Sequence, residues 1–175
     1  FRKKIIKKNI KKKKVKILDI GCGPAEILKY IPNSTYYGFD IDRRSINYAK
    51  NKFKNKNHHF HCKRFVAQDL KKVPKFDFVI LFGILHHMNN LEAKNILCLC
   101  KKVMKKNAIL LTEDPIFTKK QNFIAKFLIS HDRGMNVRFK NDYINLIKKY
   151  FKKVKFKISY QFFIPYTWFS MVCKK

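Results

Sequence analysis

The ten residues VKILDIGCGP, at positions 15–24, decide the fold of this chain. Residues 15–20 are mostly apolar or β-branched, which predicts a short buried strand. The Gly-Cys-Gly that follows is a turn signal, and Pro24 suits the first turn of a helix, because the N–H that proline lacks has no helical partner there. A strand, a glycine turn and a helix in succession predict the opening unit of an α/β protein.

The same alternation continues along the chain. Two last strands predict a closing hairpin. We therefore expect an α/β three-layer sandwich with a mainly parallel, Rossmann-like sheet of seven strands that ends in a C-terminal antiparallel hairpin. Beyond the first strand and a helix at 25–30, the predicted strands are 35–40, 60–67, 76–82, 108–113, 154–160 and 164–173, and the predicted helices are 43–53, 91–104 and 141–151.

A chain of 175 residues has the usual size of one domain, so we expect a single domain over residues 1–175. Residues 1–14 predict a basic N-terminal helix or extension, either solvated or lying on a membrane surface. The chain begins with Phe1, and its natural start is expected further upstream. The longest apolar run, 78–85, is far shorter than the roughly 20 residues that span a bilayer, and a soluble cytoplasmic protein is expected.

The charge is strongly positive. Lys and Arg number 41 against 11 Asp and Glu, a formal net charge of +30, which favours a nucleic acid or an anionic membrane as a partner. Few of these residues are arginine, the side chain that phosphate-binding sites prefer, and an A/T-rich coding composition explains a lysine excess equally well. The five cysteines are odd in number and form no CxxC pair, so neither disulfides nor a metal site is expected.

Acidic side chains gather where the predicted strands end. Asp19 lies at the end of the first strand, Asp40 ends the second and Asp69 follows the third. The carboxyl ends of parallel strands meet at one edge of a sheet, where ligands bind, and a carboxylate after the second strand can accept both hydroxyls of a ribose. The sequence therefore predicts a ligand site at this edge. The alternative role of these side chains is to cap helices and form turns.

Four segments resemble, in order and spacing, the motifs of class I S-adenosylmethionine-dependent methyltransferases, of the kind with a type 11 or 12 domain. They are VKILDIGCGPA at 15–25, YYGFDID at 36–42, FVAQDL at 65–70 and FDFVILFGILHHM at 76–88. The resemblance implies S-adenosylmethionine as cofactor, with the glycine turn at its methionine part, Asp40 at its ribose, and Ile41 and Asp69 at its adenine. The implied cofactor-binding residues are Asp19, Gly21, Cys22, Gly23, Asp40, Ile41, Asp69, Leu70, Phe82 and Gly83.

Ala25 stands where the family commonly has a third glycine. We expect the alanine to be tolerated, at negative φ in the first turn of the helix behind Pro24. Glu26 stands where a dinucleotide-binding fingerprint needs its last glycine, which weakens the rival interpretation as an NAD-dependent dehydrogenase.

Methyl transfer from a sulfonium needs alignment of the acceptor and, for some acceptors, a general base. His86 or His87, directly after the fourth strand, is the predicted base, and packing or helix capping is the alternative role of either residue. Residues 115–140 predict an insertion that sets acceptor specificity, as is usual for this fold.

Arg133 and Arg138 lie in that insertion and are predicted to bind the acceptor. The alternative is a salt bridge from either arginine to Asp132 or Glu113 that fixes the loop.

The predicted function is methylation of an oxygen or nitrogen atom of a small molecule, a sugar or a lipid-linked acceptor such as a glycolipid. The alternatives are an RNA methyltransferase that uses the lysine-rich surface, and a non-catalytic cofactor-fold or RNA-binding module. Peripheral contact with a membrane stays possible, and no stable protein partner is inferred.

Overall fold

The computed structural model describes residues 2–10, 14–119, 121–132, 134–160 and 166–175. Its sheet has the strand order β3-β2-β1-β4-β5-β8-β7, and the short strand β6 pairs with β5 beside this path. Strands β1 to β5 pair in parallel, whereas β8 runs antiparallel to both β5 and β7. The strands are β1 Lys16–Ile20, β2 Thr35–Asp40, β3 His58–Cys62, β4 Phe76–Phe82, β5 Met104–Phe117, β6 Arg138–Phe139, β7 Lys153–Tyr160 and β8 Thr167–Lys174.

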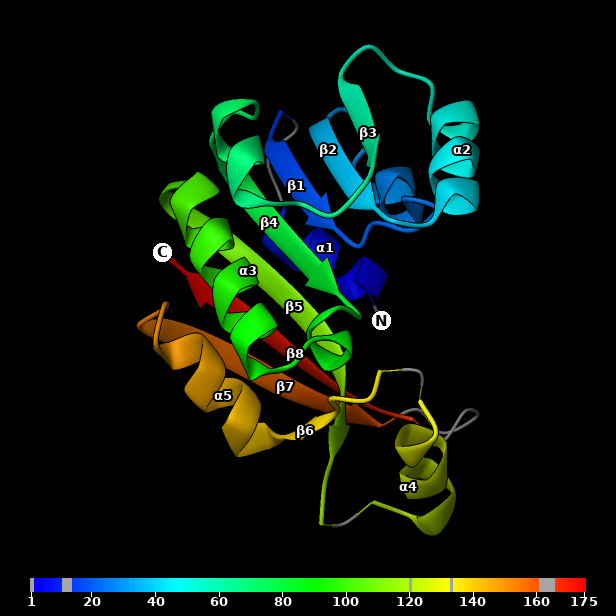
Figure 1. Ribbon diagram of the computed structural model, residues 1–175, viewed down its shortest axis with the longest axis vertical. Helices are drawn as coiled ribbons and strands as arrows, with labels where there is room; N and C mark the ends of the chain where they lie inside the picture. Colours follow the sequence, from blue (N-terminus) through cyan, green and yellow to red (C-terminus); the bar gives the residue numbers. More distant parts are fainter. Residues whose placement is uncertain (1, 11–13, 120, 133, 161–165) are drawn as a thin grey trace.

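Helices cover both faces of this sheet, which confirms the predicted three-layer α/β architecture. In Figure 1, α3 and α5 lie in front of the sheet and α1 lies behind it. The helices are α1 Arg2–Asn9, α2 Arg43–Lys52, α3 Asn90–Val103, α4 Phe123–Ser130 and α5 Lys140–Lys148, with short 3₁₀ helices η1 Glu26–Tyr30, η2 Ala67–Lys71 and η3 Leu85–His87. None of the helices in these described residues has the length and apolar character needed to cross a bilayer.

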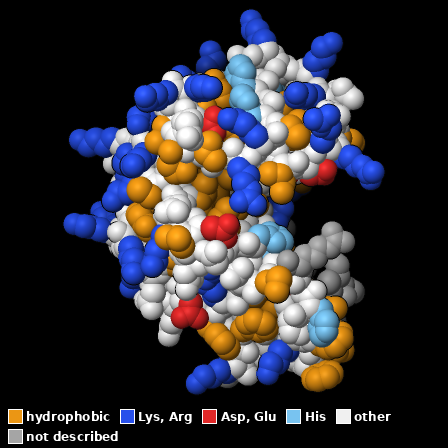
Figure 2. All heavy atoms as spheres, viewed as in Figure 1, with side chains coloured by type: hydrophobic (Ala, Val, Ile, Leu, Met, Phe, Trp, Pro, Cys, Tyr) orange, Lys and Arg blue, Asp and Glu red, His pale blue; other side chains and the backbone are white. Residues whose placement is uncertain are grey.

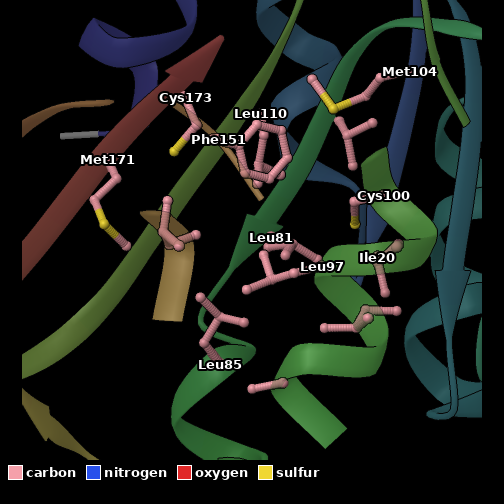
Figure 3. Packing of buried hydrophobic residues seen from close by; sticks show 14 of the residues in the cluster. Ile20, Leu81, Leu85, Leu97, Cys100, Met104, Leu110, Phe151, Met171 and Cys173 are labelled. Carbon is pink, nitrogen blue, oxygen red and sulfur yellow. The ribbon is translucent and has the colours of Figure 1, made fainter. Parts of the chain in front are cut away.

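Alternate residues of each central strand enter different cores, because successive side chains of a strand point to opposite faces. Leu18 of β1 and Leu81 of β4 pack with α3 and α5, and Figure 3 shows Leu81 against Leu97 of α3. Ile17 and Ile80, one position away on the same strands, pack with α1, η1 and α2 on the other side. Burial on both faces explains why the sequence of these strands is apolar almost throughout.

The predicted third strand is wrong at its C-terminal end. Residues 60–67 were expected in one strand, whereas β3 ends at Cys62 and Ala67 already begins η2. The Asp69 carboxylate accepts the Val66 N–H at 3.0 Å, a cap that favours a helical turn over continued strand pairing. The carboxylate expected at the end of a strand therefore lies inside a 3₁₀ helix.

The expected basic N-terminal helix is confirmed and its lysines are exposed, but its apolar side is buried in the protein; its contact with a membrane stays a prediction. Helix α1 is basic, as predicted, but Ile6 is fully buried and Ile10 is 7% exposed, both in the core shared with β1, η1 and α2. Burying apolar side chains of this size stabilises the docked helix by roughly 1.5–3 kcal/mol each. Helix α1 is thus a fixed part of the back layer.

The strand order reverses between β1 and β4, because β1 leads outward to β2 and β3 while β4 leads outward to β5. In open parallel sheets, ligands bind at the carboxyl edge beside such a reversal. The loops after β1, β2 and β4, together with the end of β5, therefore frame the candidate site. The hairpin of β7 and β8 extends the sheet on the far side of β5 and was predicted, although residues 164 and 165 of its second predicted strand lie outside the described residues.

Candidate functional site

The two glycines of the turn after β1 are required for different reasons. Gly21 has a φ of +73°, and a Cβ at this position would lie 1.9 Å from Cδ1 of Ile84, so the packing of Ile84 itself requires glycine. Gly23 has a φ of +50°, and among the described residues, apart from its chain neighbours, no atom lies within 4 Å of its Cβ position. The open space that a ligand needs next to the backbone is therefore at Gly23.

The expectation of a negative φ at Ala25 is wrong. Its φ is 54° and its ψ 32°, in the left-handed region that glycine favours. The Ala25 N–H donates to the Cys22 carbonyl at 2.9 Å, and its own carbonyl accepts from Leu28 N–H at 3.0 Å. The left-handed backbone costs an alanine about 1–2 kcal/mol, and burial of its methyl group, worth about 0.8 kcal/mol, offsets part of that cost. Ala25 thus adopts a backbone conformation that glycine would reach without this cost.

Asp40, at the end of β2, is tied to the glycine turn. Its Oδ2 accepts the Gly23 N–H at 2.7 Å, and its Oδ1 accepts the Asp42 N–H at 2.9 Å. Each carboxylate oxygen keeps a further lone pair, so Asp40 can still accept hydrogen bonds from two hydroxyls. Ile41 follows with 66% of its surface exposed, an apolar side chain that a flat ring could cover. The predicted contacts of Asp40 with ribose and of Ile41 with adenine fit this geometry.

Asp69 is buried in η2 and already has partners. One oxygen accepts the Lys63 ammonium and the other accepts the Val66 N–H. Burial alone would raise the pKa of Asp69, but the bonds from Lys63 and Val66 outweigh it, and the pKa lies below its ordinary value. Leu70 is half-buried and packs against the core with α3. Their contacts with adenine stay predictions.

Asp19 is buried beneath the glycine turn. Its Oδ2 accepts the Tyr36 hydroxyl at 2.7 Å. Burial raises the pKa of Asp19 to about 7, and the Tyr36 bond and the positive charge of Arg2 only partly oppose this. Burial also raises the pKa of the neighbouring Cys22 thiol, with the nearby Asp19 adding to the effect. Cys22 is therefore a neutral thiol next to a carboxyl that titrates near neutral pH.

Arg2, which the sequence did not single out, reaches the end of β4 from helix α1. Its Nε donates to Oε1 of buried Glu113 at 3.0 Å, and its Cζ lies 5.4 Å from the ring centroid of Phe82. A Cβ at Gly83 would lie 3.4 Å from Nη2 of Arg2 and 3.7 Å from Cε1 of His86. Gly83 therefore lies between a guanidinium and an imidazole at the carboxyl edge of the sheet.

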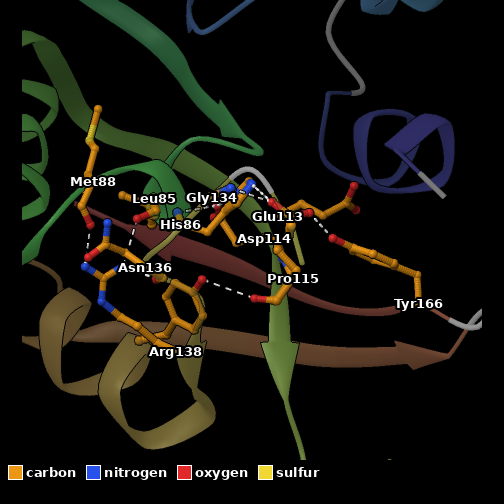
Figure 4. A network of polar contacts seen from close by, with 12 residues as sticks. Leu85, His86, Met88, Glu113, Asp114, Pro115, Gly134, Asn136, Arg138 and Tyr166 are labelled. Atoms are coloured by element: carbon orange, nitrogen blue, oxygen red, sulfur yellow. Dashed lines mark hydrogen bonds and ion pairs between the residues drawn. The ribbon is translucent and has the colours of Figure 1, made fainter. Parts of the chain in front are cut away.

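His86 is held by carboxylates on both sides of its ring (Figure 4). Its Nδ1 lies 2.9 Å from Oδ1 of Asp114, which also accepts the His86 N–H at 3.1 Å. Its Nε2 lies 3.3 Å from Oδ1 of Asp132, and the hydroxyl of Tyr166 donates to the other oxygen of Asp132. Burial raises the pKa of Tyr166, as does the contact with Asp132, so its hydroxyl keeps its proton. The resulting chain of contacts joins η3, β5, the loop after α4 and the segment before β8.

The two predicted histidines are placed differently. His86 is 5% exposed, whereas His87 is exposed, and their ring centroids lie 4.0 Å apart. Gly134 lies so close that a Cβ there would be 1.9 Å from Cδ2 of His86, so the loop after α4 packs directly on this ring. The packing role considered for the pair thus applies to His86, together with a fixed orientation of its ring.

Arg138 is 9% exposed and fastens loops to one another. Its guanidinium donates to the Leu85 carbonyl at 2.7 Å, to the Met88 carbonyl and to Oδ1 of Asn90 at 3.1 Å. Acceptor binding by Arg138 stays a prediction, but its geometry is that of an anchor for η3. Arg133 lies outside the described residues.

The sequence analysis gave a salt bridge from Arg138 to Asp132 or Glu113 as the alternative to acceptor binding, and this prediction is wrong. Glu113 accepts from Arg2, and Asp132 contacts His86 and Tyr166. The contacts that fix the loop run from Arg138 to backbone carbonyls instead.

Five residues at this edge lay outside the sequence prediction of the site: Arg2, Glu113, Asp114, Asp132 and Tyr166. Glu113, Asp114 and Asp132 are among the few acidic residues of a lysine-rich chain, and this rarity could have marked them as candidate site residues. Arg2 and Tyr166 gave none, because their contacts join segments far apart in the chain. Across the part of the chain that the structure describes, no group of three or more His, Cys, Asp or Glu side chains is arranged to hold a metal ion.

Comparison with known proteins identifies the family. Residues 11–154 match the family model described as a methyltransferase domain. No curated protein matches the chain significantly.

Solved structures share the fold at low sequence identity. A SAM-dependent methyltransferase from Archaeoglobus fulgidus is 16% identical, with a TM-score of 0.74 over 99% of this chain and 93% of its own. The N-methyltransferase NodS from Bradyrhizobium japonicum, in complex with S-adenosyl-l-homocysteine, is 14% identical, with a TM-score of 0.70 over 92% of this chain and 78% of its own.

Human N-acetylserotonin methyltransferase in complex with SAM is 19% identical, with a TM-score of 0.66 over 91% of this chain. The chain spans only 47% of that enzyme's length.

The carboxyl edge of the sheet fits the cofactor of this family. It offers open backbone at Gly23, a carboxylate with free lone pairs at Asp40, an exposed apolar side chain at Ile41 and a guanidinium at Arg2. Because its family model matches residues 11–154, most of the chain, the protein belongs to the methyltransferase domain family, and its fold is that of S-adenosylmethionine-dependent methyltransferases.

Proposed function

We propose that the chain methylates an oxygen or nitrogen atom of a small, sugar or lipid-linked acceptor, with His86 as the general base. The observation that carries this proposal is the fixed imidazole of His86 between Asp114 and Asp132, beside Gly83 at the carboxyl edge. The cofactor supplies a methyl group on an activated sulfur when bound. The protein then has to align the acceptor and take up its proton.

Asp114 and Asp132 contact different nitrogens of the His86 ring and have different proposed roles. Asp114 contacts Nδ1 and the His86 N–H, and this orients the ring and directs Nε2 away from β5. In the proposed reaction, a proton is taken up at Nε2, which lies 3.3 Å from Oδ1 of Asp132, and this oxygen can accept it in a hydrogen bond. Burial of His86 limits the water that competes for this proton.

The surroundings of Asp132 favour its negatively charged form. Burial alone would raise the pKa of Asp132, but the hydrogen bonds from Tyr166 and from the Gly134 N–H outweigh it and place the pKa below its ordinary value. Asp132 therefore carries its negative charge at neutral pH. Asp132 and Tyr166 are positioning residues, since each acts on the acceptor only through His86.

Arg2 is proposed to bind the carboxylate of the cofactor's methionine part. Its guanidinium borders Gly83 and has a partner in Glu113, whose pKa is raised by burial despite the contact with Arg2. Arg2→Ala is expected to weaken binding of S-adenosylhomocysteine about tenfold, the usual worth of a charge-assisted hydrogen bond. Binding of methylthioadenosine, which lacks the amino acid part, is expected to stay unchanged in titration calorimetry. Equal weakening of both ligands would contradict this role.

The proposed reaction is tested with methyl-labelled S-adenosylmethionine and a panel of phenols, amines, sugars, lipid extracts and RNA. We expect label in a small or lipid-linked acceptor for the wild-type chain and little label for His86→Ala. Label found only in RNA would overturn the acceptor class in favour of the RNA alternative. Cofactor binding without label in any acceptor would contradict the proposal as a whole.

A further inference from the structure

Helix α4 is apolar on the side that faces away from the protein. Ala125 and Ile129, four residues apart, are buried against the body. Four other side chains point outward, with exposed fractions of 82%, 58%, 52% and 38%, and we call them the α4 face: Phe123, Ile124, Phe127 and Leu128. Figure 2 shows hydrophobic side chains gathered at the lower right end of the molecule, where Figure 1 places α4.

An exposed apolar face of this kind indicates a surface that binds another molecule or a membrane. Its members are one turn apart in pairs, Phe123 with Phe127 and Ile124 with Leu128, so they form one continuous stripe along the helix. The buried residues of α4, Ala125 and Ile129, lie on the opposite side of the helix from this stripe. Within the stripe, the Phe127 ring packs against the His131 ring, with centroids 4.2 Å apart.

The charge around the α4 face is positive. The chain has no acidic residue between Asp114 and Asp132, whereas Lys119 and Lys126 lie in this stretch and are exposed. The whole chain carries a formal net charge of +30. A second copy of the chain would bring the same large positive charge to the face and be repelled, while a negatively charged surface would be attracted.

We propose that the α4 face inserts into the surface of an anionic lipid bilayer. Phenylalanine and branched aliphatic side chains partition into the boundary between headgroups and acyl chains, and flanking lysines contact anionic headgroups. RNA fits less well, because Ile124 and Leu128 cannot stack on bases as aromatic rings do.

The position of the α4 face gives the bilayer a role in catalysis. The loop directly after α4 carries Asp132, which contacts Nε2 of His86, and Gly134, which packs on the same ring. A bilayer that holds α4 therefore holds the wall of the site where the acceptor arrives. This step rests on the proposed function and narrows its acceptor to an amphiphile whose polar group reaches His86 from the membrane surface.

The test measures binding to vesicles of phosphatidylcholine alone and of phosphatidylcholine mixed with phosphatidylglycerol, at low and at high salt. The variant is Phe123→Ser with Phe127→Ser, which removes apolar surface and changes no charge. The matched control is Leu91→Ser on α3, whose side chain is 67% exposed. Calorimetric titration with S-adenosylhomocysteine checks that each variant is folded.

We expect the wild-type chain and the Leu91 variant to bind the mixed vesicles alike. The α4 variant is expected to bind them about tenfold more weakly at high salt, where attraction between lysines and headgroups is screened and insertion dominates. Equal binding by all three proteins at high salt would overturn the inference, because lysines alone would then explain it. Dimerisation or salt-resistant RNA binding that depends on the α4 face would also overturn it, in favour of that occupant.

The outcome is separable from the fate of the proposed function. Vesicle binding through the α4 face, with no methyl transfer to any acceptor, would leave the docking surface standing and contradict the reaction. Methyl transfer to a water-soluble acceptor, with no contribution of the α4 face to vesicle binding, would support the reaction and contradict the docking surface.

Discussion

The two halves of the carboxyl edge are built in different ways. The half formed by β1, β2 and the glycine turn is joined by short-range contacts: Gly23 to Asp40 and Asp19 to Tyr36 each span 17 positions. The half around His86 is joined over longer distances, 28 positions from His86 to Asp114 and 53 from Arg138 to Leu85. The contacts at β1, β2 and the glycine turn, which we call the cofactor half, are therefore specified locally. The acceptor half around His86, like the pair of Arg2 and Glu113, forms only once β4 and β5 have joined the sheet.

The largest effect is expected at the centre of the acceptor half. His86→Ala is expected to lower kcat for methyl transfer by about 10²–10⁴, the usual contribution of a positioned general base. Its affinity for S-adenosylhomocysteine should change little, because the two halves use separate contacts. His87→Ala is the matched control and should keep most of the activity; the reverse pattern would assign the base to His87 and break the distinction drawn here.

Asp40→Ala should do the opposite and damage only the cofactor half. Loss of hydrogen bonds to a charged group, at about 1.5–3 kcal/mol, is expected to weaken binding of S-adenosylhomocysteine about 10- to 100-fold in calorimetry. The control is Asp42→Ala: Asp42 caps α2 by accepting the N–H groups of Arg44 and Ser45, and its loss should lower stability more than affinity. Equal affinities of the Asp40 variant and the wild type would remove Asp40 from the site.

Asp19 makes stability in the cofactor half depend on pH. Its pKa is about 7 in the folded chain, against the ordinary value of 3.8 for an aspartate exposed to water in the unfolded chain. Between these values the unfolded chain releases the proton that the folded chain keeps, so stability falls as pH rises and stays reduced above pH 7. Each pKa unit is worth about 1.4 kcal/mol, which sets an upper limit of about 4 kcal/mol.

Asp19→Asn removes this penalty and can keep the bond from Tyr36. In urea unfolding, its gain over the wild type should be about 2 kcal/mol larger at pH 8 than at pH 5. Asp142→Asn, at an exposed position of α5, is the control and should show no such difference. An equal gain for the Asp19 variant at both pH values would contradict the raised pKa.

The smallest effect is expected at Ala25. Ala25→Gly relieves the left-handed strain, removes a buried methyl group and loosens the unfolded chain, three changes of about 1 kcal/mol each that largely cancel. We expect the free energy of unfolding to change by less than about 1 kcal/mol, with unchanged cofactor affinity. A large gain in affinity would show that the alanine distorts the glycine turn.

The same contrast explains what the sequence could predict. The apolar strands and the carboxylates at their ends are local patterns, so β1, β2 and β4 and the place of Asp40 were predictable. The left-handed backbone of Ala25 was not, because its cause is the pair of hydrogen bonds that closes the turn. Arg2 reaches Glu113 across 111 positions, and no pattern along the chain indicates such a contact. The outward direction of the apolar side chains of the α4 face is likewise shown only by the structure.

Amide hydrogen exchange with and without S-adenosylhomocysteine tests the central claim most directly, since it locates the cofactor on the chain. We predict slower exchange in residues 19–23, 40–42 and 67–71 when the ligand is bound, with little change in α5 and β7. Unchanged exchange in those three segments, with slowing confined to other parts of the chain, would contradict the placement of the cofactor at the carboxyl edge of β1 and β2.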